Sequence, residues 1–392
     1  ITQSFADLFI LCEKIFSLSG VWPSKPSYIK FPIYCTYYVL FLVLSYADLF
    51  DILGNLELTV MNMVETIVYT ITFTMILVLR FSNLLKRVIY VAKKEIAEYN
   101  FENDDEREIY DNYHYISKMF FKISNIGMVI TVTLSYIRPL MNFATTTGCQ
   151  SYFIFLVIAQ TNNTNPYVLP VRIRTFFELS NTRDYIFVYL YLFPMIYMST
   201  CHMTAICVLI NLVFHICANL SILSYRIRNI NVKSEKDVQR RIRSLIQIHL
   251  KIIWMARSLD DAFNVVLLDE LLGNSIVLAI SMYYVLVSYD TAELATCCTF
   301  AFFAFTALVM LYGFCLIGDQ LTQQSINVLD AYYECNWQEM SASSKRSLLI
   351  CMIRARAFLH LTAGKFYIFS LNGFTDVLKT SMAYLSMLRT VM

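Results

Sequence analysis

Long apolar stretches separated by shorter polar connections are the main pattern along this chain. A helix that crosses a lipid bilayer needs about 20 mostly apolar residues, because the hydrocarbon core is about 30 Å thick and each residue adds about 1.5 Å. Seven stretches meet this requirement, and we therefore predict seven transmembrane helices. They cover approximately Phe31–Phe50, Thr59–Leu79, Ile123–Met141, Tyr185–Tyr225, Phe263–Tyr289, Leu294–Gly318 and Phe366–Leu388.

Two of the apolar stretches have unusual lengths. Tyr185–Tyr225 contains no Asp, Glu, Lys or Arg and is longer than a bilayer requires, so this helix is expected to project beyond the membrane. Ser151–Gln160, between the third and fourth spans, is about half the length needed to cross. We interpret it as a lid or a re-entrant segment in the outer loop.

Helical periodicity continues into two of the inner connections. Within Arg241–Phe263, apolar residues recur at steps of three or four, at Leu245, Ile248, Ile252 and Met255. This spacing predicts an amphipathic helix that continues into the fifth span. Ser347–Leu361 is predicted to be a second helix, with Gly364 as its stop. With the projecting end of the fourth span, these helices are expected to form a bundle below the membrane, either as local packing or as a domain that joins subunits.

The composition agrees with a membrane protein. Hydrophobic residues make up 57% of the 392 residues and charged residues 15%, whereas soluble domains have about 45 to 50% and about 25%. A net charge of +2 argues against a nucleic-acid-binding protein. The 11 cysteines include no CxxC spacing, so neither a disulfide framework nor a zinc site is indicated.

The distribution of Lys and Arg predicts the orientation of the chain. With the N-terminus inside, 24 of the 31 basic residues fall in inner segments, and only Arg138, Arg172, Arg174 and Arg183 fall in outer ones. Cytoplasmic loops carry the excess of basic residues, so the N-terminus is expected inside and, after seven spans, the C-terminus outside. A G-protein-coupled receptor has the opposite orientation and becomes an alternative. In the outer loop, Asn162 begins an Asn-Asn-Thr glycosylation sequence.

Catalytic and cofactor motifs are missing from the sequence. The nine glycines are spaced so widely that no GxG, GxSxG or GxxxG sequence occurs. The closest pair, Gly313 and Gly318, is followed by Asp319 instead of the Lys of a P-loop. The five histidines show no HExxH or other tight metal spacing. We therefore expect a protein that is not an enzyme and uses no cofactor or metal, although an intramembrane enzyme or a transporter with scattered residues stays an alternative.

A few charged residues interrupt the spans, and such residues are the default candidates for function inside a membrane. They are Glu65, Asp269, Glu270, Asp376 and Lys379. Glu65, Asp269 and Glu270 are interpreted as cavity-facing groups, as paired groups, or as groups that lie closer to an aqueous end than the span boundaries suggest. Asp376 and Lys379 are three residues apart on one helix and can pair.

The C-terminal quarter of the chain resembles a known family. From Ile317 the sequence reads IGDQLTQQSINVLDAYYECNWQEM, and from Leu361 it reads LTAGKFYIFSLNGFTDVLKTSMAYLSMLRTVM. These segments, together with PYVLP at 166–170 and FFEL at 176–179, resemble insect odorant receptors. The residues that carry the resemblance are Cys335, Trp337, the Ala363–Tyr367 run, Ser370, Leu371 and Phe374. A gustatory receptor is the neighbouring alternative, but its TYxxxxxQF-type ending is missing.

The resemblance implies an odorant-binding subunit of a ligand-gated, non-selective cation channel. Such a subunit assembles as a heterotetramer with the family's co-receptor in the plasma membrane of a sensory neuron dendrite. The chain is similar to a tuning subunit, because the co-receptor has a much longer second inner loop. The implied regions are an N-terminal arm (1–30), helices one to six (31–318) with an outer loop (142–184), an inner anchor region (319–362) and a pore-lining seventh helix (363–392).

The resemblance also implies where ligand and pore residues lie. In this family a small hydrophobic volatile binds in the outer half of the bundle, among spans two to six. The matching positions are Tyr69, Phe73, Thr133, Tyr136, Ile137, Phe187, Tyr191, Met195, Tyr283, Tyr284, Phe300, Phe303 and Thr306. Met387 is implied as the gate, with Ala383, Thr380 and Thr390 on a similar face of the seventh helix. An apolar cage with scattered hydroxyls suits a weakly polar ligand.

Overall fold

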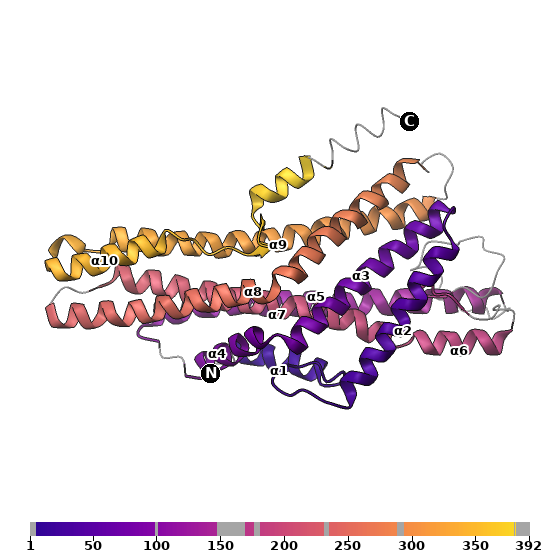
Figure 1. The fold of residues 1–392 in the computed structure, drawn as a ribbon, viewed down its shortest axis with the longest axis horizontal. Helices are drawn as coiled ribbons and strands as arrows, with labels where there is room; N and C mark the ends of the chain where they lie inside the picture. Colours follow the sequence, from indigo (N-terminus) through magenta and orange to yellow (C-terminus); the bar gives the residue numbers. More distant parts are fainter. Residues whose placement is uncertain are drawn as a thin grey trace.

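The computed structural model describes residues 5–98, 101–146, 169–175, 181–230, 235–287, 294–379 and 381. The described chain is an elongated helical bundle with one small antiparallel sheet (Figure 1). The helices are α1 (Phe5–Phe16), α2 (Lys30–Asp51), α3 (Leu56–Phe81), α4 (Asn83–Glu98), α5 (Asp104–Thr146), α6 (Thr182–Leu192), α7 (Met195–Arg228), α8 (Glu235–Val287), α9 (Leu294–Glu334), the short 3-10 helix η2 (Trp337–Glu339) and α10 (Ala342–Ala355). Strands β1 (Thr362–Ala363) and β2 (Tyr367–Ile368) form the sheet.

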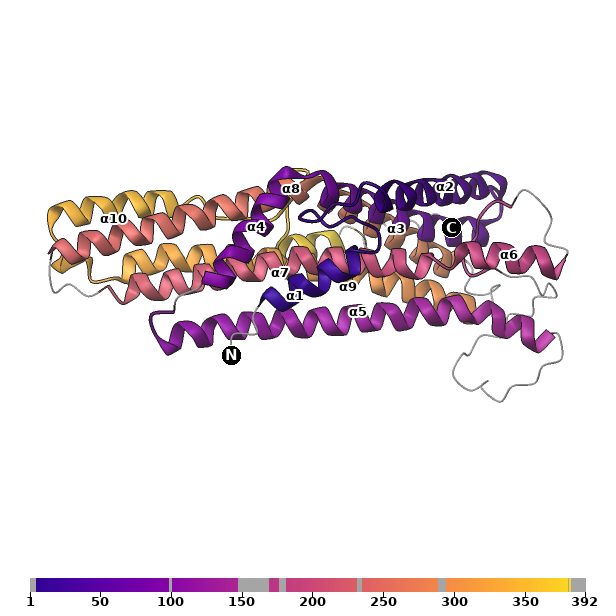
Figure 2. The same ribbon diagram turned by 90° about the horizontal axis from the view of Figure 1, so that it is seen from below.

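Helix α7 lies at the centre of the bundle, in contact with α1, α3, α5, α8 and α9 (Figure 2). Every side chain from 204 to 220 is buried. A helix that is apolar on all sides must be covered by neighbours, which explains why the longest uncharged stretch of the sequence became the core. Some of the polar side chains on α7 form hydrogen bonds across the interfaces. Thr204 Oγ1 donates to Asn125 Oδ1 at 2.9 Å, and Ser117 Oγ donates to Asn211 Oδ1 at 3.1 Å.

One end of the molecule is formed by α10 and the adjoining ends of α7, α8 and α9 (Figure 1). We call this the α10 end and the opposite one, near α6, the α6 end. Helix α8 has 53 residues, so at about 1.5 Å per residue it is far longer than a bilayer requires. The predicted continuation of an amphipathic helix into the fifth span is therefore confirmed, with Leu245, Ile252 and Met255 on its buried face.

Ion pairs tie the helices together at the α10 end. Arg226 donates through Nε and Nη2 to both carboxylate oxygens of Glu106, each at 2.7 Å. Arg228 Nε lies 2.6 Å from Glu334 Oε2. Arg241 donates to Glu102, and this hydrogen bond, with the charges of Arg226 and Arg241, lowers the pKa of that carboxyl despite its partial burial. The bundle predicted from the inner connections is thus held by charges as well as by apolar packing.

The predicted fourth span is interrupted in the structure. Helix α6 ends at Leu192 and α7 begins at Met195, with Phe193 and Pro194 between them. Proline has no backbone N–H to donate to the preceding turn, so an apolar stretch that looks continuous still breaks at this position. Helix α6 nevertheless continues in nearly the same direction as α7 (Figure 2).

The segment before the seventh span also differs from the prediction. The helix expected over Ser347–Leu361 ends at Ala355, and the seventh helix does not begin at Phe366. A hairpin lies between them, because Gly364 and Lys365 have positive φ angles of 57° and 67° and turn β1 back onto β2. Helix resumes at 371–379, where Ser370 Oγ accepts from Gly373 N at 3.1 Å.

Six helices in the described part of the chain are long and apolar enough to cross a membrane. They overlap the first six predicted spans, and the fourth comprises both α6 and α7. The predicted seventh span, Phe366–Leu388, is described only as far as residue 381, so its last residues lie outside the described part. The Ser151–Gln160 segment, predicted to be a lid, also lies outside them.

Two glycines of α9 offer a matched test of how closely the hairpin packs on this helix. A Cβ at Gly318 would lie 2.4 Å from the carbonyl oxygen of Phe369, whereas a Cβ at Gly313 would meet nothing within 4 Å. We expect Gly318→Ala to lower the free energy of unfolding by about 1–3 kcal/mol, because backbone must shift. Gly313→Ala is expected to be neutral or to stabilise by up to about 1 kcal/mol, because alanine favours helix. Thermal unfolding of the purified variants measures both, and equal melting temperatures would contradict the close packing.

Candidate functional site

The aromatic side chains expected to contact a ligand fall into two groups on different sides of α3. The first group lies among α2, α3, α5, α6 and α7 and comprises Tyr69, Phe73, Tyr136, Tyr191 and Met195. In it, Tyr136 donates its hydroxyl to the carbonyl of Tyr189 at 2.7 Å, and Tyr189 donates back to the carbonyl of Tyr136. Because these hydroxyls are satisfied within the protein, the rings present mainly apolar surface.

The second group lies between α3, α8 and α9. Tyr284 and Phe300 are almost fully buried, with ring centroids 4.3 Å apart, and Phe303 follows at 6.1 Å from Phe300. Val60 and Val64 of α3 close this group. Thr306 donates its hydroxyl to the carbonyl of Phe303 at 2.8 Å, so only the acceptor lone pairs of that oxygen are left for another partner.

The remaining predicted residues are not brought into either group. Ile137 and Phe187 are 41% and 71% exposed, on the outside of the chain, and Thr133 and Tyr283 are partly buried. A stretch that is apolar on all sides gives no periodic signal of which face is buried, so the pattern around Phe187 could not exclude it. The gate positions Thr380, Ala383, Met387 and Thr390 and the glycosylation candidate Asn162 lie outside the described residues.

An aromatic face of α2 belongs with the first group but was absent from the sequence-based set. Tyr37 donates its hydroxyl to the carbonyl of Tyr191 at 2.8 Å. The ring of Tyr38 lies 5.1 Å from that of Phe73, and the ring of Phe41 lies 4.9 Å from that of Tyr69. Spacings of three and four residues put Phe41 on the same side of α2 as Tyr37 and Tyr38. Because α2 is apolar on most sides, the sequence pattern does not show that this side meets protein.

A buried polar pair joins α7 to α8 near the first group. His202 Nε2 lies 3.6 Å from Glu270 Oε1, and both side chains are buried. Asn274 Nδ2 donates to Glu270 Oε2 at 3.0 Å. Burial of Glu270 argues against a place near an aqueous end, and Asn274 partners one of its oxygens, whereas Oε1 has no hydrogen-bond partner among the described residues. Polar groups inside an apolar bundle are costly unless paired, so this contact fixes how α7 and α8 align.

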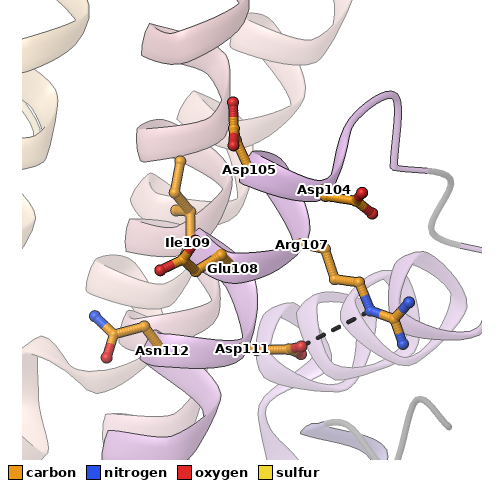
Figure 3. A pocket seen from close by; sticks show the side chains of 7 residues that line it. All are labelled: Asp104, Asp105, Arg107, Glu108, Ile109, Asp111 and Asn112. Carbon is orange, nitrogen blue, oxygen red and sulfur yellow. Dashed lines mark ion pairs between the residues drawn. The ribbon is translucent and has the colours of Figure 1, made fainter.

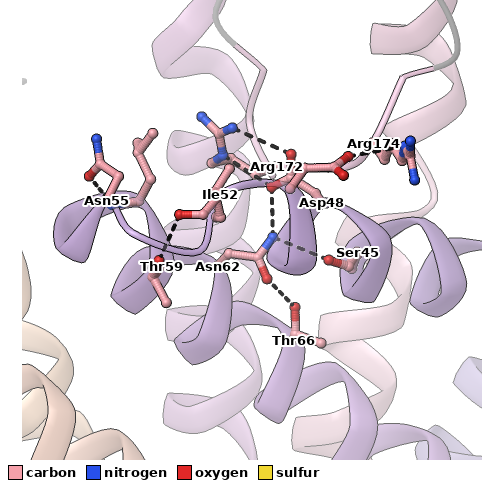
Figure 4. Close-up of polar contacts among 11 residues, drawn as sticks. Ser45, Asp48, Ile52, Asn55, Thr59, Asn62, Thr66, Arg172 and Arg174 are labelled. Carbon is pink, nitrogen blue, oxygen red and sulfur yellow. Dashed lines mark hydrogen bonds and ion pairs between the residues drawn. The ribbon is translucent and has the colours of Figure 1, made fainter.

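The α6 end of the bundle is closed by an outer-loop segment, 169–175, whose Val171 and Ile173 are buried. Arg172 donates through Nε and Nη2 to the two carboxylate oxygens of Asp48 on α2, at 3.2 and 3.4 Å (Figure 4). Asn62 of α3 donates to the same carboxylate at 2.8 Å. We call this cluster the outer lock, because one carboxylate joins α2, α3 and the loop.

The hairpin before the final helix is fastened to α8 by one aspartate. Thr362 donates to Asp260 Oδ1 through its backbone N–H at 2.7 Å and through its hydroxyl at 2.8 Å. Lys365 Nζ lies 2.6 Å from Asp260 Oδ2 and 2.6 Å from Asp261 Oδ1. Burial alone would lower the pKa of Lys365, but the two carboxylates outweigh it and raise that pKa, so the lysine stays charged at neutral pH. We call this cluster the Asp260 clamp.

Two surface hollows lie apart from the aromatic groups. The larger, of about 700 Å³, surrounds the start of α5 and is lined mainly by the acids Asp104, Asp105, Glu108 and Asp111 (Figure 3). An acidic, open surface lacks the apolar enclosure that a volatile ligand needs. The second, of about 570 Å³, lies among α4, α7 and α8. There Glu95 contacts Lys251 at 2.6 Å and His215 at 3.0 Å, and these partners outweigh burial and lower the pKa of Glu95.

Comparisons with known proteins agree with the resemblance seen in the sequence. A family model described as 7tm Odorant receptor matches residues 55–382. Odorant receptor 13a of Drosophila melanogaster is 28% identical over 191 residues, which is 45% of this chain and 46% of that protein. The Odorant receptor coreceptor of the same species is 24% identical over 160 residues, 40% of this chain and 32% of that protein. The matched stretch therefore spans less than half of either curated relative.

The fold is similar to that of a solved insect receptor. The olfactory receptor OR5 from Machilis hrabei matches with a TM-score of 0.77 and 13% identity, over 98% of both chains. The same receptor in complex with eugenol matches with a TM-score of 0.76, over 99% of this chain. At this identity the likeness concerns the fold, and it extends the helical agreement over nearly the whole chain.

The outer lock can be tested against a neighbouring ion pair in the same loop. Arg172 and Asp48 have side chains 36% and 11% exposed, whereas Arg174 and Asp51 are 54% and 48% exposed at a similar 3.0 Å. We expect Arg172→Ala to cost about 1–3 kcal/mol of unfolding free energy, because it leaves a buried carboxylate unpaired. Arg174→Ala is expected to cost less than about 1 kcal/mol, as exposed pairs do. Thermal unfolding compares them, and equal losses would exclude a special role for Arg172.

Proposed function

Because this chain belongs to the 7tm Odorant receptor family, we propose that it is the odorant-binding subunit of a ligand-gated, non-selective cation channel. The channel is a heterotetramer with the odorant receptor co-receptor in the plasma membrane of a sensory neuron dendrite. The proposal places the N-terminus inside and the C-terminus outside, as the excess of basic residues in the inner segments indicates. The single observation that carries it is the family match over residues 55–382.

The proposed ligand is a small hydrophobic volatile that binds in the outer half of the bundle. The two aromatic groups support this, because buried rings supply dispersion and desolvation energy with few polar contacts. A relative of the same fold was solved with eugenol, a ligand of that general kind. In the proposed orientation, the Tyr284–Phe300 group lies toward the outer ends of α8 and α9, the helices on either side of the third outer connection.

Assembly is proposed to involve the anchor region, residues 319–362. Helix α10 exposes Leu349, Ile350 and Ile353 at 58 to 67%. Apolar side chains gathered on one exposed helix are typical of a surface that contacts another protein. Co-receptors are among the curated relatives, which supports a partner subunit of similar shape.

Gating is proposed to be a population shift between closed and open states. A ligand that fits the open state better by about 1.4 kcal/mol changes the open-to-closed ratio tenfold. The proposed constriction is Met387, with Ala383, Thr380 and Thr390 on a similar face of the pore-lining helix. The Asp260 clamp supports a coupling between the ligand site and this constriction. Helix α8 carries Tyr284 near its C-terminal end and holds the hairpin before the seventh helix through Asp260.

Ligand-evoked current in cells that express this chain with the co-receptor tests the function. We expect a volatile panel to evoke cation current that persists with a G-protein blocker in the pipette. Phe303→Ala is expected to shift half-maximal concentrations by about tenfold, the effect of losing about 1.4 kcal/mol of ring contact. Phe302→Ala is the matched control, because Phe302 is 52% exposed on the same helix.

Surface staining of a C-terminal epitope tag on live cells controls that experiment. Staining without permeabilisation shows that each variant reaches the surface and that the C-terminus is outside. Current that disappears with the G-protein blocker would favour a G-protein-coupled receptor, and identical tuning of wild type and Phe303→Ala would remove the second aromatic group from the ligand site.

The proposed coupling through the clamp is tested by two adjacent aspartates. Asp260 accepts from Thr362 and Lys365 and its side chain is 13% exposed, whereas Asp261 contacts only Lys365 among these groups and is 54% exposed. We expect Asp260→Asn to reduce maximal current or raise half-maximal concentration about tenfold, because the hairpin loses the less exposed of its two ion pairs and the charged acceptor of Thr362. Asp261→Asn is expected to have a much smaller effect. Equal concentration–response curves for all three proteins, at equal surface staining, would disprove the coupling.

A further inference from the structure

An arginine at the end of α3 is surrounded by aromatic rings. The guanidinium carbon of Arg80 lies 5.2 Å from the ring centroid of Phe31, 5.7 Å from that of Tyr28 and 5.8 Å from that of Phe81. Phe31 and Phe81 are themselves in edge contact at 5.6 Å. Cation–π contacts stabilise a guanidinium, but they do not use its N–H donors.

The donors of Arg80 are incompletely used by the protein. Its Nε atom is buried without a hydrogen-bond partner, and no carboxylate pairs with the side chain in the part of the chain that the structure describes. A charged group left without a counterion in a partly buried place is costly, so an anion at this position would be stabilising.

The surface around Arg80 combines apolar and basic side chains. Tyr28 is 83% exposed, Ile29 76% and Phe81 64%, and Lys30 is also exposed. We call these four residues and Arg80 the Arg80 patch. The patch is continuous, because the Phe31–Phe81 contact places the start of α2 beside the end of α3. Its charged side chains are both basic, which complements an anion and disfavours a basic partner.

The position of the patch identifies the kind of anion. It lies where α2 and α3, two helices of membrane-spanning length, begin and end together. Lipid headgroups occupy this level of a bilayer, and aromatic and basic side chains gather there. Ile10 and Leu11 are exposed on the side of α1 opposite its buried face, and Leu18 is exposed in the turn after α1. Lys30 Nζ donates to the carbonyl of Ser17 at 3.3 Å and joins this segment to the patch.

We propose that the Arg80 patch is a binding site for the phosphate headgroup of an anionic phospholipid. The phosphate oxygens accept from Arg80 and Lys30, and the acyl chains lie along the exposed apolar side chains of α2. In the proposed orientation of the receptor this lipid lies in the inner leaflet, and only that assignment rests on the proposed function. The lipid fixes the ends of α2 and α3, whose other ends carry the outer lock.

Lipid retention by the purified protein tests the proposal. The protein is placed in nanodiscs of phosphatidylcholine with a minority of phosphatidylserine, and the lipids that stay bound after mild detergent extraction are counted by native mass spectrometry. We expect phosphatidylserine to be enriched on the wild type. Arg80→Gln and Lys30→Gln should each reduce the enrichment about fivefold, as the loss of one basic residue near a membrane surface predicts. Arg240→Gln is the control, because its side chain is 81% exposed at the α10 end.

Each outcome decides the proposal independently of channel function, because the readout needs neither ligand nor current. Equal retention of phosphatidylserine by the wild type and both patch variants, or equal retention of the two lipids by the wild type, would overturn it. If the patch instead binds an acidic protein, the lipid counts stay equal among these proteins, and the lipid proposal is likewise overturned. If Arg80→Gln does not fold, Lys30→Gln decides, because its ammonium contacts only an exposed carbonyl.

Discussion

The burial of α7 on all sides is the constraint on which the rest of the structure depends. In its most apolar window 89% of the residues are buried, against 17 to 50% for the other five candidate spans. Such a helix cannot face water and gains most from close packing by protein. The neighbours α3, α5, α8 and α9 are therefore placed by the need to cover it, and each keeps another face exposed, whereas α7 has no free side.

Directional contacts are found at the α10 end, at the α6 end and near the middle of α8. Dispersion between apolar side chains is individually weak and tolerates small shifts, whereas charged hydrogen bonds fix distance and angle. The outer lock joins α2, α3 and the outer loop through Asp48, and the Asp260 clamp joins α8 to the final hairpin. The Tyr284–Phe300 group lies beside the turn of α3 that carries Asn62, because Val60 and Val64 pack in that group. The His202–Glu270 contact adds a polar contact between α7 and α8 inside the bundle.

The sequence predicted the helices well where a local pattern determines them. Apolar length located the first six spans, and periodicity located the inner extension of α8, because both reflect the environment of consecutive residues. The predicted start of the seventh helix was wrong, since the hairpin there depends on Asp260, which is 102 residues away from Thr362. The outer lock was not predicted for the same reason, because Asp48 and Arg172 are 124 residues apart in the sequence. For the candidate ligand site, the aromatic residues could be identified from the sequence. Which of them face the interior of the bundle could not be predicted from it. Tyr37 and Phe187 differ in which side of the helix meets protein, and only the packed bundle determines that.

The charge asymmetry of the chain also explains where its cations find partners. The inner segments collect most of the basic residues, and the same segments contain acids that pair with several of them. Glu106 binds Arg226, Glu95 binds Lys251, and Asp260 binds Lys365. These acids lie where several helices pack together, and protein surrounds them. Where α2 begins and α3 ends the surface is exposed, so the cation there has aromatic rings as neighbours instead of carboxylates. Arg80 is such a cation. Aromatic rings surround its guanidinium group, and its Nε atom lacks a hydrogen-bond acceptor.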